Sequence, residues 1–293
     1  MKEVMDGYLT YLTAEQNRSA NTVDSYRRDL TQALDYLESN GVVDWANVDQ
    51  YMLLNLVANM RSHGRSASTI NRMLSALRQF FRYLVRHHHV TFNPMEMVDN
   101  VQTESTSEPL VLSEDEIKLL LSMDLDGTLA ARNKALLLLM AATGMRVSEV
   151  IKLRTSDLHL DVKMIRLGAD SKRERLIPIS QDAVDALDGY VNGLRDQIVV
   201  DDEDAVFVNA HGHQMTRQGV WMILKEIFDA SGIDKTVTPQ TLRYSFAVHL
   251  LRSGADTRLI KEMLGYSDMR ALQPYLKMSV QEISSDYENH QPW

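Results

Sequence analysis

The chain has 293 residues, and 44% of them are apolar, so it is long enough to bury the cores of two domains. The net charge of -9 argues, taken alone, against a nucleic-acid partner. Such a partner would need the basic residues to cluster on one part of the surface. The lack of cysteine excludes disulfides and thiolate metal sites, and the sequence shows neither an apolar run that would cross a membrane nor an apolar signal region. We therefore expect a cytoplasmic protein with no membrane segment.

The first hundred residues are expected to form four helices, because their apolar residues recur at helical spacing. The polar pair Asn21-Thr22 is expected to cap one of these helices, and Asn40-Gly41 to end it. A further helix starts near Val48, and the fourth runs over 66–87 after a turn at 62–64.

The helix over 66–87 is expected to have one cationic face and one apolar face. Between Gln50 and Met95 the sequence has no Asp or Glu. It has six arginines there: Arg61, Arg65, Arg72, Arg78, Arg82 and Arg86. The last four fall within an arc of roughly 120° on the helix. Surface faces normally mix charges, so a basic face without an acidic partner favours contact with the DNA backbone over plain solvation.

Residues 100–109 (NVQTESTSEP) are polar and are expected to form a linker. This predicts a helical DNA-binding domain over 1–99 and a second domain over 110–293. Ten extended residues reach about 35 Å, which is enough for two domains to sit on opposite sides of a duplex.

The second domain is expected to be mostly helical with a small sheet. Ser113 opens it with a capping box, and Thr143-Gly144 breaks a buried helix over 132–142. The other expected elements are strands over 162–167, 175–179 and 205–209, a hairpin loop over 168–174, and helices over 182–195 and 216–230.

A further helix is expected to begin at the cap Thr238, with Pro239 at its first position, and to stop at Gly254. This frame places Gln240 and Arg243 on one face near the helix N-terminus. An arginine there is poorly placed for the helix dipole, so an anion such as a phosphate is expected close by.

Three short blocks follow one another in this domain: ATGMRVSE over 142–149, TLRYSFA over 241–247, and LGYS over 264–267, the last followed by Tyr275. By these blocks and their order the chain resembles the tyrosine recombinases, or phage integrases, and most of all their Xer-like members. The resemblance covers nearly the whole chain. It implies a mainly helical fold with a small β-sheet, in which a four-helix core-binding (SAM-like) domain precedes a mixed α+β catalytic domain.

The resemblance assigns a phosphate clamp to Arg146 and Arg243 and the nucleophile to Tyr275. The planar fork of a guanidinium matches phosphate oxygens in a way that lysine cannot copy. In the family, attack by the tyrosine leaves a 3′-phosphotyrosine and a free 5′ hydroxyl, so a second strand's 5′ hydroxyl can reverse the step and exchange partners.

The two arginines also have plain structural interpretations. Arg146 has Glu149 three residues later for an ion pair on a surface turn. Arg243 has Asp256 or Asp268 as a candidate partner.

Tyr275 has a structural alternative as well, a ring packed in a C-terminal helix, and Tyr287 is its nearest competitor as nucleophile. The spacing of Val280, Ile283 and Tyr287 predicts a short amphipathic tail helix. In the family such a tail docks on the neighbouring protomer of a tetramer built on two duplexes. The alternative is packing against its own domain.

Three positions depart from the family pattern. Gln240 stands where the family has a histidine, and it cannot take a proton near pH 7. Tyr266 stands where the family has a second histidine or a tryptophan, and its hydroxyl can still donate. The family's catalytic lysine falls on Asp170, which would repel a phosphate, so Lys172 in the same loop becomes the candidate general acid, with an idle surface lysine as the alternative.

No metal or cofactor is expected. The sequence shows no carboxylate cluster with two-metal spacing and no glycine-rich phosphate loop. The histidines at 87–89 point in different directions along a helix, and His211 and His213 flank a glycine in a turn, so neither group is expected to hold a metal.

The first interpretation is a recombinase that cuts and joins double-stranded DNA as a homo- or hetero-tetramer with a second recombinase, at a rate that the departures from the family's lysine and histidines are expected to lower. Xer-like members resolve chromosome dimers, which links them to chromosome partition and cell division, and similar integrases move elements into chromosomes. The sequence leaves both roles open. A relative that has lost cleavage and acts as a DNA-binding accessory subunit is the alternative. A type IB topoisomerase is disfavoured by the four-helix N-terminal domain.

Overall fold

The computed structural model describes residues 1–102, 109–169 and 174–278. The chain divides into two compact units, Met1–Thr106 and Ser107–Trp293, each with its own hydrophobic core. The division falls within the segment 100–109 that the sequence marks as a linker, and the predicted bounds of that linker and of the two domains stay a prediction. In the described part of the chain no helix is long and apolar enough to span a membrane.

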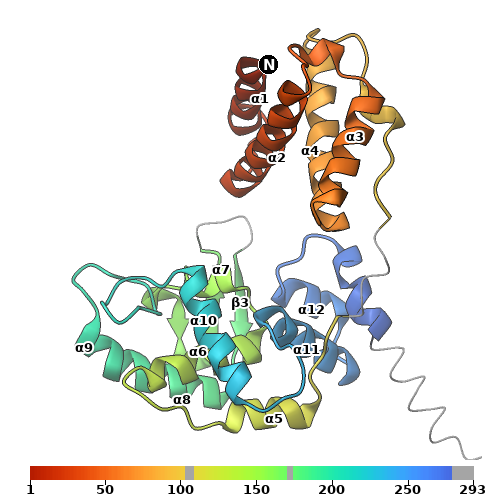
Figure 1. The fold of residues 1–293 in the computed structure, drawn as a ribbon. Helices are drawn as coiled ribbons and strands as arrows, with labels where there is room; N and C mark the ends of the chain where they lie inside the picture. Colours follow the sequence, from red (N-terminus) through yellow and green to blue (C-terminus); the bar gives the residue numbers. More distant parts are fainter. Residues whose placement is uncertain (103–108, 170–173, 279–293) are drawn as a thin grey trace, which may run out of the picture. The chain divides into compact units, whose positions relative to one another are not determined.

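The first unit contains the four expected helices, α1 (Lys2–Ala14), α2 (Ala20–Ser39), α3 (Gln50–Ser62) and α4 (Ala67–Arg86) (Figure 1). The short 3-10 turns η1 (Trp45–Asn47) and η2 (Pro94–Met97) complete it. Helix α4 packs against the other three, and its apolar face fills the centre of this unit. Trp45 meets Phe80 and Phe81 edge to face, with ring centroids 4.9 and 5.9 Å apart.

The caps of the first unit agree with the sequence in one helix and differ in another. Ser66 caps α4, because its hydroxyl accepts a hydrogen bond from the backbone N–H of Thr69. The prediction that Asn21-Thr22 caps α2 is wrong. The cap is Ser19, which is extended and accepts from the N–H of Thr22, so the helix begins at Ala20.

The second unit is mainly helical around a three-stranded sheet, so the predicted fold class is confirmed (Figure 1). Its helices are α5 (Glu114–Ser122), α6 (Ala130–Thr143), α7 (Val147–Val150), α8 (Gln181–Gly189), α9 (Asp196–Ile198), α10 (Arg217–Ala230), α11 (Pro239–Arg252) and α12 (Thr257–Met263). Its 3-10 turns are η3 (Thr155–Asp157), η4 (Leu160–Val162) and η6 (Met269–Leu272), and the π-helical turn η5 (Tyr190–Arg195) joins α8 to α9.

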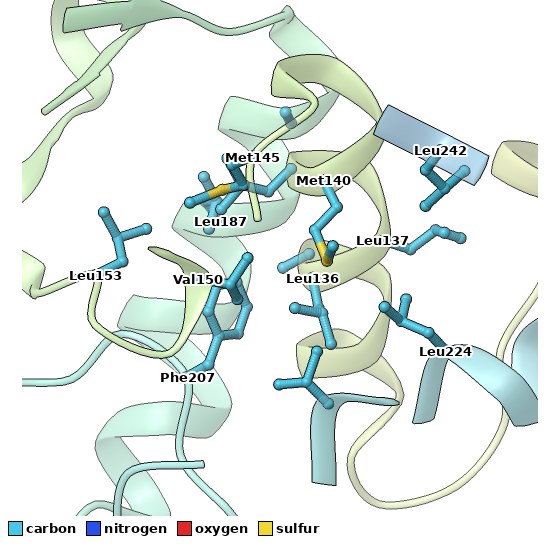
Figure 2. Packing of buried hydrophobic residues seen from close by; sticks show 14 of the residues in the cluster. Leu136, Leu137, Met140, Met145, Val150, Leu153, Leu187, Phe207, Leu224 and Leu242 are labelled. Carbon is cyan, nitrogen blue, oxygen red and sulfur yellow. The ribbon is translucent and has the colours of Figure 1, made fainter. Parts of the chain in front are cut away.

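Helix α6 is the centre of this unit. Beyond its polar first turn, residues 135–142 are apolar on all sides, as expected of a buried helical segment, and the helix packs against α8, α10 and α11. Figure 2 shows Leu136, Leu137 and Met140 of α6 among side chains such as Phe207 and Leu242 from other parts of the unit. This packing fixes the position of the C-terminal end of α6 at Gly144.

The sheet has the order β1-β2-β3, formed by Leu158–His159, Met164–Leu167 and Arg175–Pro178. Both pairs are antiparallel, and Ile165 lies opposite Ile177. The predicted hairpin of β2 and β3 is confirmed, whereas the two-residue strand β1 was not predicted because two residues carry no periodicity.

The strand predicted over 205–209 is wrong. Ala205 and Val208 each form only an isolated bridge, and their partners are Arg154 and Gln214. Because the two ends pair with different segments, no continuous ladder forms. The apolar residues of this run are buried all the same, which explains why the run looks like a strand in the sequence.

Two glycines set the ends of α6 and α11 as the sequence predicts. Gly144 has φ +59° and ends α6, and Gly254 has φ +81° just after α11. Thr238 caps α11 by accepting from the N–H of Thr241, and Pro239 occupies the first position of the helix. The stop at Gly144 places Arg146 just after α6, and the cap at Thr238 places Arg243 near the start of α11.

Replacing Gly144 by alanine is expected to lower stability more than the same change at Gly254. Both residues are left-handed, which costs alanine about 1–2 kcal/mol. A Cβ at Gly144 would also lie 2.6 Å from Cδ1 of Phe246, whereas a Cβ at Gly254 would meet nothing within 4 Å. Calorimetry of the full chain should show a larger drop in the midpoint for Gly144→Ala, at about 2–4 °C per kcal/mol. Equal drops would contradict the crowding at Gly144.

Candidate active site

Arg146 lies between Gly144 and helix α7, and its two ends are held by different partners. Its backbone N–H donates to Oε2 of Glu149 at 2.7 Å, which caps α7. Its guanidinium Nη1 lies 3.6 Å from Oε1 of the same carboxylate and 3.3 Å from the carbonyl oxygen of Leu264. The ion pair that the sequence offers as an alternative is therefore present, but the guanidinium also reaches a distant segment.

Arg243 lies in α11 and is one of the largest fully buried side chains, with 2% of it exposed. Its Nη1 donates to the carbonyl of Gly144 at 2.5 Å, and its Nη2 donates to the carbonyl of Leu264 at 2.6 Å. Among the described residues, neither Asp256 nor Asp268 pairs with it. Two backbone carbonyls from separate turns thus hold the guanidinium in one orientation.

The two arginines meet. Both donate to the carbonyl of Leu264, and both guanidinium carbons lie over the ring of Tyr266, at 5.2 Å for Arg146 and 5.0 Å for Arg243. Burial and the neighbouring charge of Arg243 lower the pKa of Arg146. Two like charges are therefore held close together by carbonyl oxygens and an aromatic face.

A cavity of about 400 Å³ opens beside this pair. It is lined by Met145, Arg146, Val147, Ser148, Arg217, Trp221, Thr238, Pro239, Gln240 and Arg243. Gln240 is exposed on the first turn of α11. The cavity brings three guanidinium groups, an amide and the N-terminus of α11 to one place, which is a setting suited to an anion such as a phosphate.

Arg217 and Trp221 of α10 are lining residues that the sequence analysis missed. Arg217 is the first residue of α10, directly after the cap Thr216. A cation in a first turn opposes the helix dipole, and the same signal drew attention to Arg243. It could have found Arg217 as well.

Glu149 is held from its other side by Arg175 of strand β3. Arg175 has a nearly buried side chain and donates from Nη2 to Oε1 of Glu149 at 2.7 Å and from Nε to the carbonyl of Met263 at 2.8 Å. It lies so close to Gly265 that a Cβ there would be 2.9 Å from its Cζ. This arginine ties β3 to α7 and to the end of α12.

Tyr275 lies in a helical stretch at 273–278 and is 2% exposed. Its hydroxyl oxygen is 2.6 Å from that of Tyr266, and its ring centroid is 4.8 Å from that of Tyr244. The ring is thus packed, as the structural alternative proposes, while the hydroxyl is directed to Tyr266. Through Tyr266 the hydroxyl is linked to Arg146 and Arg243.

The two phenols have opposite pKa shifts. Burial, and then its hydrogen bond to Tyr266, raise the pKa of Tyr275. Burial alone would raise that of Tyr266 too, but the hydrogen bond from Tyr275 and the guanidinium groups of Arg243 and Arg146 outweigh it and lower the pKa. In this pair Tyr266 is the better proton acceptor.

Two predicted features lie outside the described residues. These are Lys172 and Asp170 of the hairpin loop, and the tail beyond Met278 with Tyr287. Among the described residues, no group of three His, Cys, Asp or Glu side chains is arranged to hold a metal ion.

The basic face of α4 is partly occupied within its own unit. Arg72 makes two hydrogen bonds to Asp29 of α2, at 2.9 and 2.8 Å, and the Asp29 side chain is 4% exposed. The expectation that this face has no acidic partner is therefore wrong for Arg72, because the partner comes from outside the window 50–95. Arg78 donates to the carbonyl of Val98 at 2.9 Å.

Four of the predicted DNA-contacting arginines remain exposed, and among the described residues they have no recorded ion pair. They are Arg61, Arg65, Arg82 and Arg86. Arg82 and Arg86 line one hollow of about 250 Å³ in the first unit.

Family models match both units. The model described as the phage integrase family matches residues 111–282, and the model for the phage integrase N-terminal SAM-like domain matches residues 5–88. The chain belongs to the phage integrase family of tyrosine recombinases. The predicted family is thereby confirmed, and the fold with it.

Relatives within this family match along their whole length. The chain is 36% identical over 295 residues to a tyrosine recombinase XerD of Oceanobacillus iheyensis, covering 100% of this chain and 99% of the relative. It is also 36% identical over 296 residues to the XerD of Listeria innocua, with the same coverage. These relatives place the chain among the Xer-like recombinases.

Solved structures of the family share the fold. The XerH recombinase in a post-cleavage complex with its palindromic difH substrate gives a TM-score of 0.77 at 20% identity, covering 92% of this chain and 80% of that one. A lambda integrase dimer bound to a COC′ core site gives a TM-score of 0.72 at 15% identity, covering 94% of each chain. At these identities the likeness concerns the fold alone.

Arg243→Lys in this recombinase is expected to lower the free energy of unfolding by about 1–3 kcal/mol, because one ammonium cannot reproduce two fixed hydrogen bonds and leaves a buried carbonyl unsatisfied. Denaturant unfolding of the full chain measures the loss. Arg258→Lys on the exposed side of α12 is the matched control and should stay within about 0.5 kcal/mol of wild type. Equal values for both variants would contradict a structural role of the Arg243 fork.

Proposed function

We propose that this chain is a site-specific DNA recombinase of the Xer type, which cuts and rejoins strands through a 3′-phosphotyrosine at Tyr275. The observation that carries the proposal is the meeting of Arg146 and Arg243 at the carbonyl of Leu264, beside a cavity open to a phosphate. The full-length similarity to XerD recombinases supports it.

The proposed chemistry uses the clamp and the nucleophile in sequence. The forks of Arg146 and Arg243 bind the non-bridging oxygens of the scissile phosphate and stabilise the charge that builds on them. The oxygen of Tyr275 attacks phosphorus, and the 5′ oxygen leaves as a hydroxyl. The 5′ hydroxyl of a second strand then attacks the phosphotyrosine and completes the exchange.

Neither ATP nor a metal is needed in this scheme. The covalent link to Tyr275 keeps the energy of the broken phosphodiester, and the guanidinium pair supplies the positive charge that a metal would supply elsewhere. Gln240 in place of the family histidine removes one acid-base group. Loss of such a group costs about 10²- to 10⁴-fold, so we expect slow strand cleavage. Lys172 is the proposed general acid.

DNA and a multimeric assembly are the proposed partners. Solved relatives with this fold include recombinases on their DNA sites, among them a lambda integrase dimer. We propose a tetramer on two duplexes, formed with itself or with a second recombinase, with a role in chromosome dimer resolution or in element integration. The exposed arginines of the first unit, Arg61, Arg65, Arg82 and Arg86, would contact the DNA backbone.

The first test is covalent capture. A duplex selected by binding from a random-sequence library is nicked near the crossover so that cleavage traps the enzyme on DNA. Wild type is expected to form a slow adduct on a denaturing gel, and Tyr275→Phe, which keeps the packed ring but lacks the oxygen, is expected to form none. Retained DNA binding without any wild-type adduct would support the accessory-subunit alternative instead.

The second test concerns the basic face. Arg82→Ala is expected to weaken DNA binding for all sequences and to reduce the slope of log K against log salt by about one, because one phosphate contact is lost. Arg72→Ala is the comparison, since its guanidinium is already engaged by Asp29. Titrations at several salt concentrations measure both. If Arg72→Ala reduces the slope and Arg82→Ala does not, this assignment of the phosphate contacts is wrong.

A further inference from the structure

The proton of the proposed nucleophile needs an acceptor. A phenol attacks phosphorus only as it loses its proton. The pKa of Tyr275 is raised by burial, so its hydroxyl holds the proton more firmly than a free tyrosine does. Gln240, at the position of the family histidine, has an amide that cannot take a proton near pH 7.

One polar group lies within hydrogen-bond distance of the Tyr275 hydroxyl. Within the described residues, the one recorded hydrogen-bond partner of the Tyr275 hydroxyl is the hydroxyl oxygen of Tyr266, at 2.6 Å. That distance is within the range for direct proton transfer. The backbone of Tyr266 is held in a turn, since its N–H donates to the carbonyl of Lys261 at 3.0 Å.

We propose that the oxygen of Tyr266, as a phenolate between two guanidinium groups, accepts the proton of Tyr275 during strand cleavage and returns it during rejoining. This role rests on the proposed function, since it needs Tyr275 to be the nucleophile. It differs from the donor role that the family pattern suggests for position 266.

The surroundings of Tyr266 favour its charged form. The charged and titratable groups around it are Arg146 before α7, Glu149 on the far side of Arg146, Arg243 and Tyr244 on α11, Tyr275 in 273–278, and Arg175 under Gly265. Two cations lie at about 5 Å from the ring, while the one carboxylate is paired with arginines. These charges lower the pKa of Tyr266 against the effect of burial.

The step balances as follows. The bond between the Tyr275 oxygen and phosphorus forms while the bond from phosphorus to the 5′ oxygen breaks, and the Tyr275 proton moves to Tyr266. The departing 5′ oxygen takes its proton from a separate acid, for which Lys172 is the candidate, or from water. In rejoining, the attacking 5′ hydroxyl gives its proton to the conjugate base of that acid or to water, and the released Tyr275 oxygen recovers its proton from Tyr266.

Three substitutions at position 266 separate an acceptor from a donor. Phenylalanine neither accepts nor donates, tryptophan only donates, and histidine does both. If Tyr266 accepts the proton, adduct formation falls about 10²- to 10⁴-fold in both Tyr266→Phe and Tyr266→Trp, whereas Tyr266→His retains most of the rate. Tyr244→Phe, which removes a neighbouring hydroxyl, is the matched control and is expected to cleave like wild type.

A second substrate separates the proton transfer from the nucleophile Tyr275 from the proton transfer to the leaving group. A duplex with sulfur in place of the bridging 5′ oxygen releases a thiolate, which needs no acid. On this substrate Lys172→Ala is expected to recover the wild-type rate if it is the acid. Tyr266→Phe is expected to remain slow, because its defect lies on the attacking side.

The pH profile of the full-length wild type on the sulfur substrate is the third readout. The rate should rise with pH while Tyr266 is protonated and level off above its pKa, which lies below the ordinary tyrosine value of 10.0. In Tyr266→Phe the rate should keep rising, because Tyr275 must then ionise unaided. Duplex binding by each variant checks that it folds.

The outcomes separate this inference from the proposed function. If wild type binds the duplex but gives no adduct on either substrate, the proposed function fails and this role fails with it. If wild type gives the adduct and Tyr266→Phe or Tyr266→Trp cleaves as fast, only the acceptor role is overturned. A wild-type rate on the sulfur substrate that does not change with pH would overturn it as well.

Discussion

The carbonyl oxygen of Leu264 is the point on which the catalytic unit depends. Two guanidinium groups donate to it, at 3.3 Å from Arg146 and 2.6 Å from Arg243. Like charges at this spacing repel, and they stay together because this carbonyl, that of Gly144 and the carboxylate of Glu149 face them. The ends of α6 and α12 and the start of α11 must therefore arrive at one place.

The parts of this arrangement that depend on neighbouring residues could be predicted from the sequence. The caps at Ser113 and Thr238 use a side chain and a backbone N–H three residues apart, and the stops at Gly144 and Gly254 need a residue that tolerates positive φ. Such signals lie within one helical turn. They place Arg243 near the N-terminus of its helix and Arg146 just after the break at Gly144, whereas the short helix α7 that follows Arg146 was not predicted.

The parts that depend on contacts between distant segments could not be predicted. Asp29 pairs with Arg72 across two helices, and no short window of sequence contains both residues. Arg217 stands out in the sequence only as a cation in a first helical turn, and that signal does not say which cavity it enters. The link between Tyr266 and Tyr275 belongs to the same class. The resemblance names the positions of these tyrosines, but the family residue at 266 is not a tyrosine, so the pattern contains no such pair.

Glu149 serves two arginines at once, Arg146 on its own turn and Arg175 on β3. A shared counter-ion makes these positions interdependent, so the effect of changing one depends on what stands at the other. During divergence a lineage that lost the β3 arginine would alter the charge balance at the α7 turn, and compensation would have to arise there. The hairpin and the turn are therefore expected to evolve as one unit.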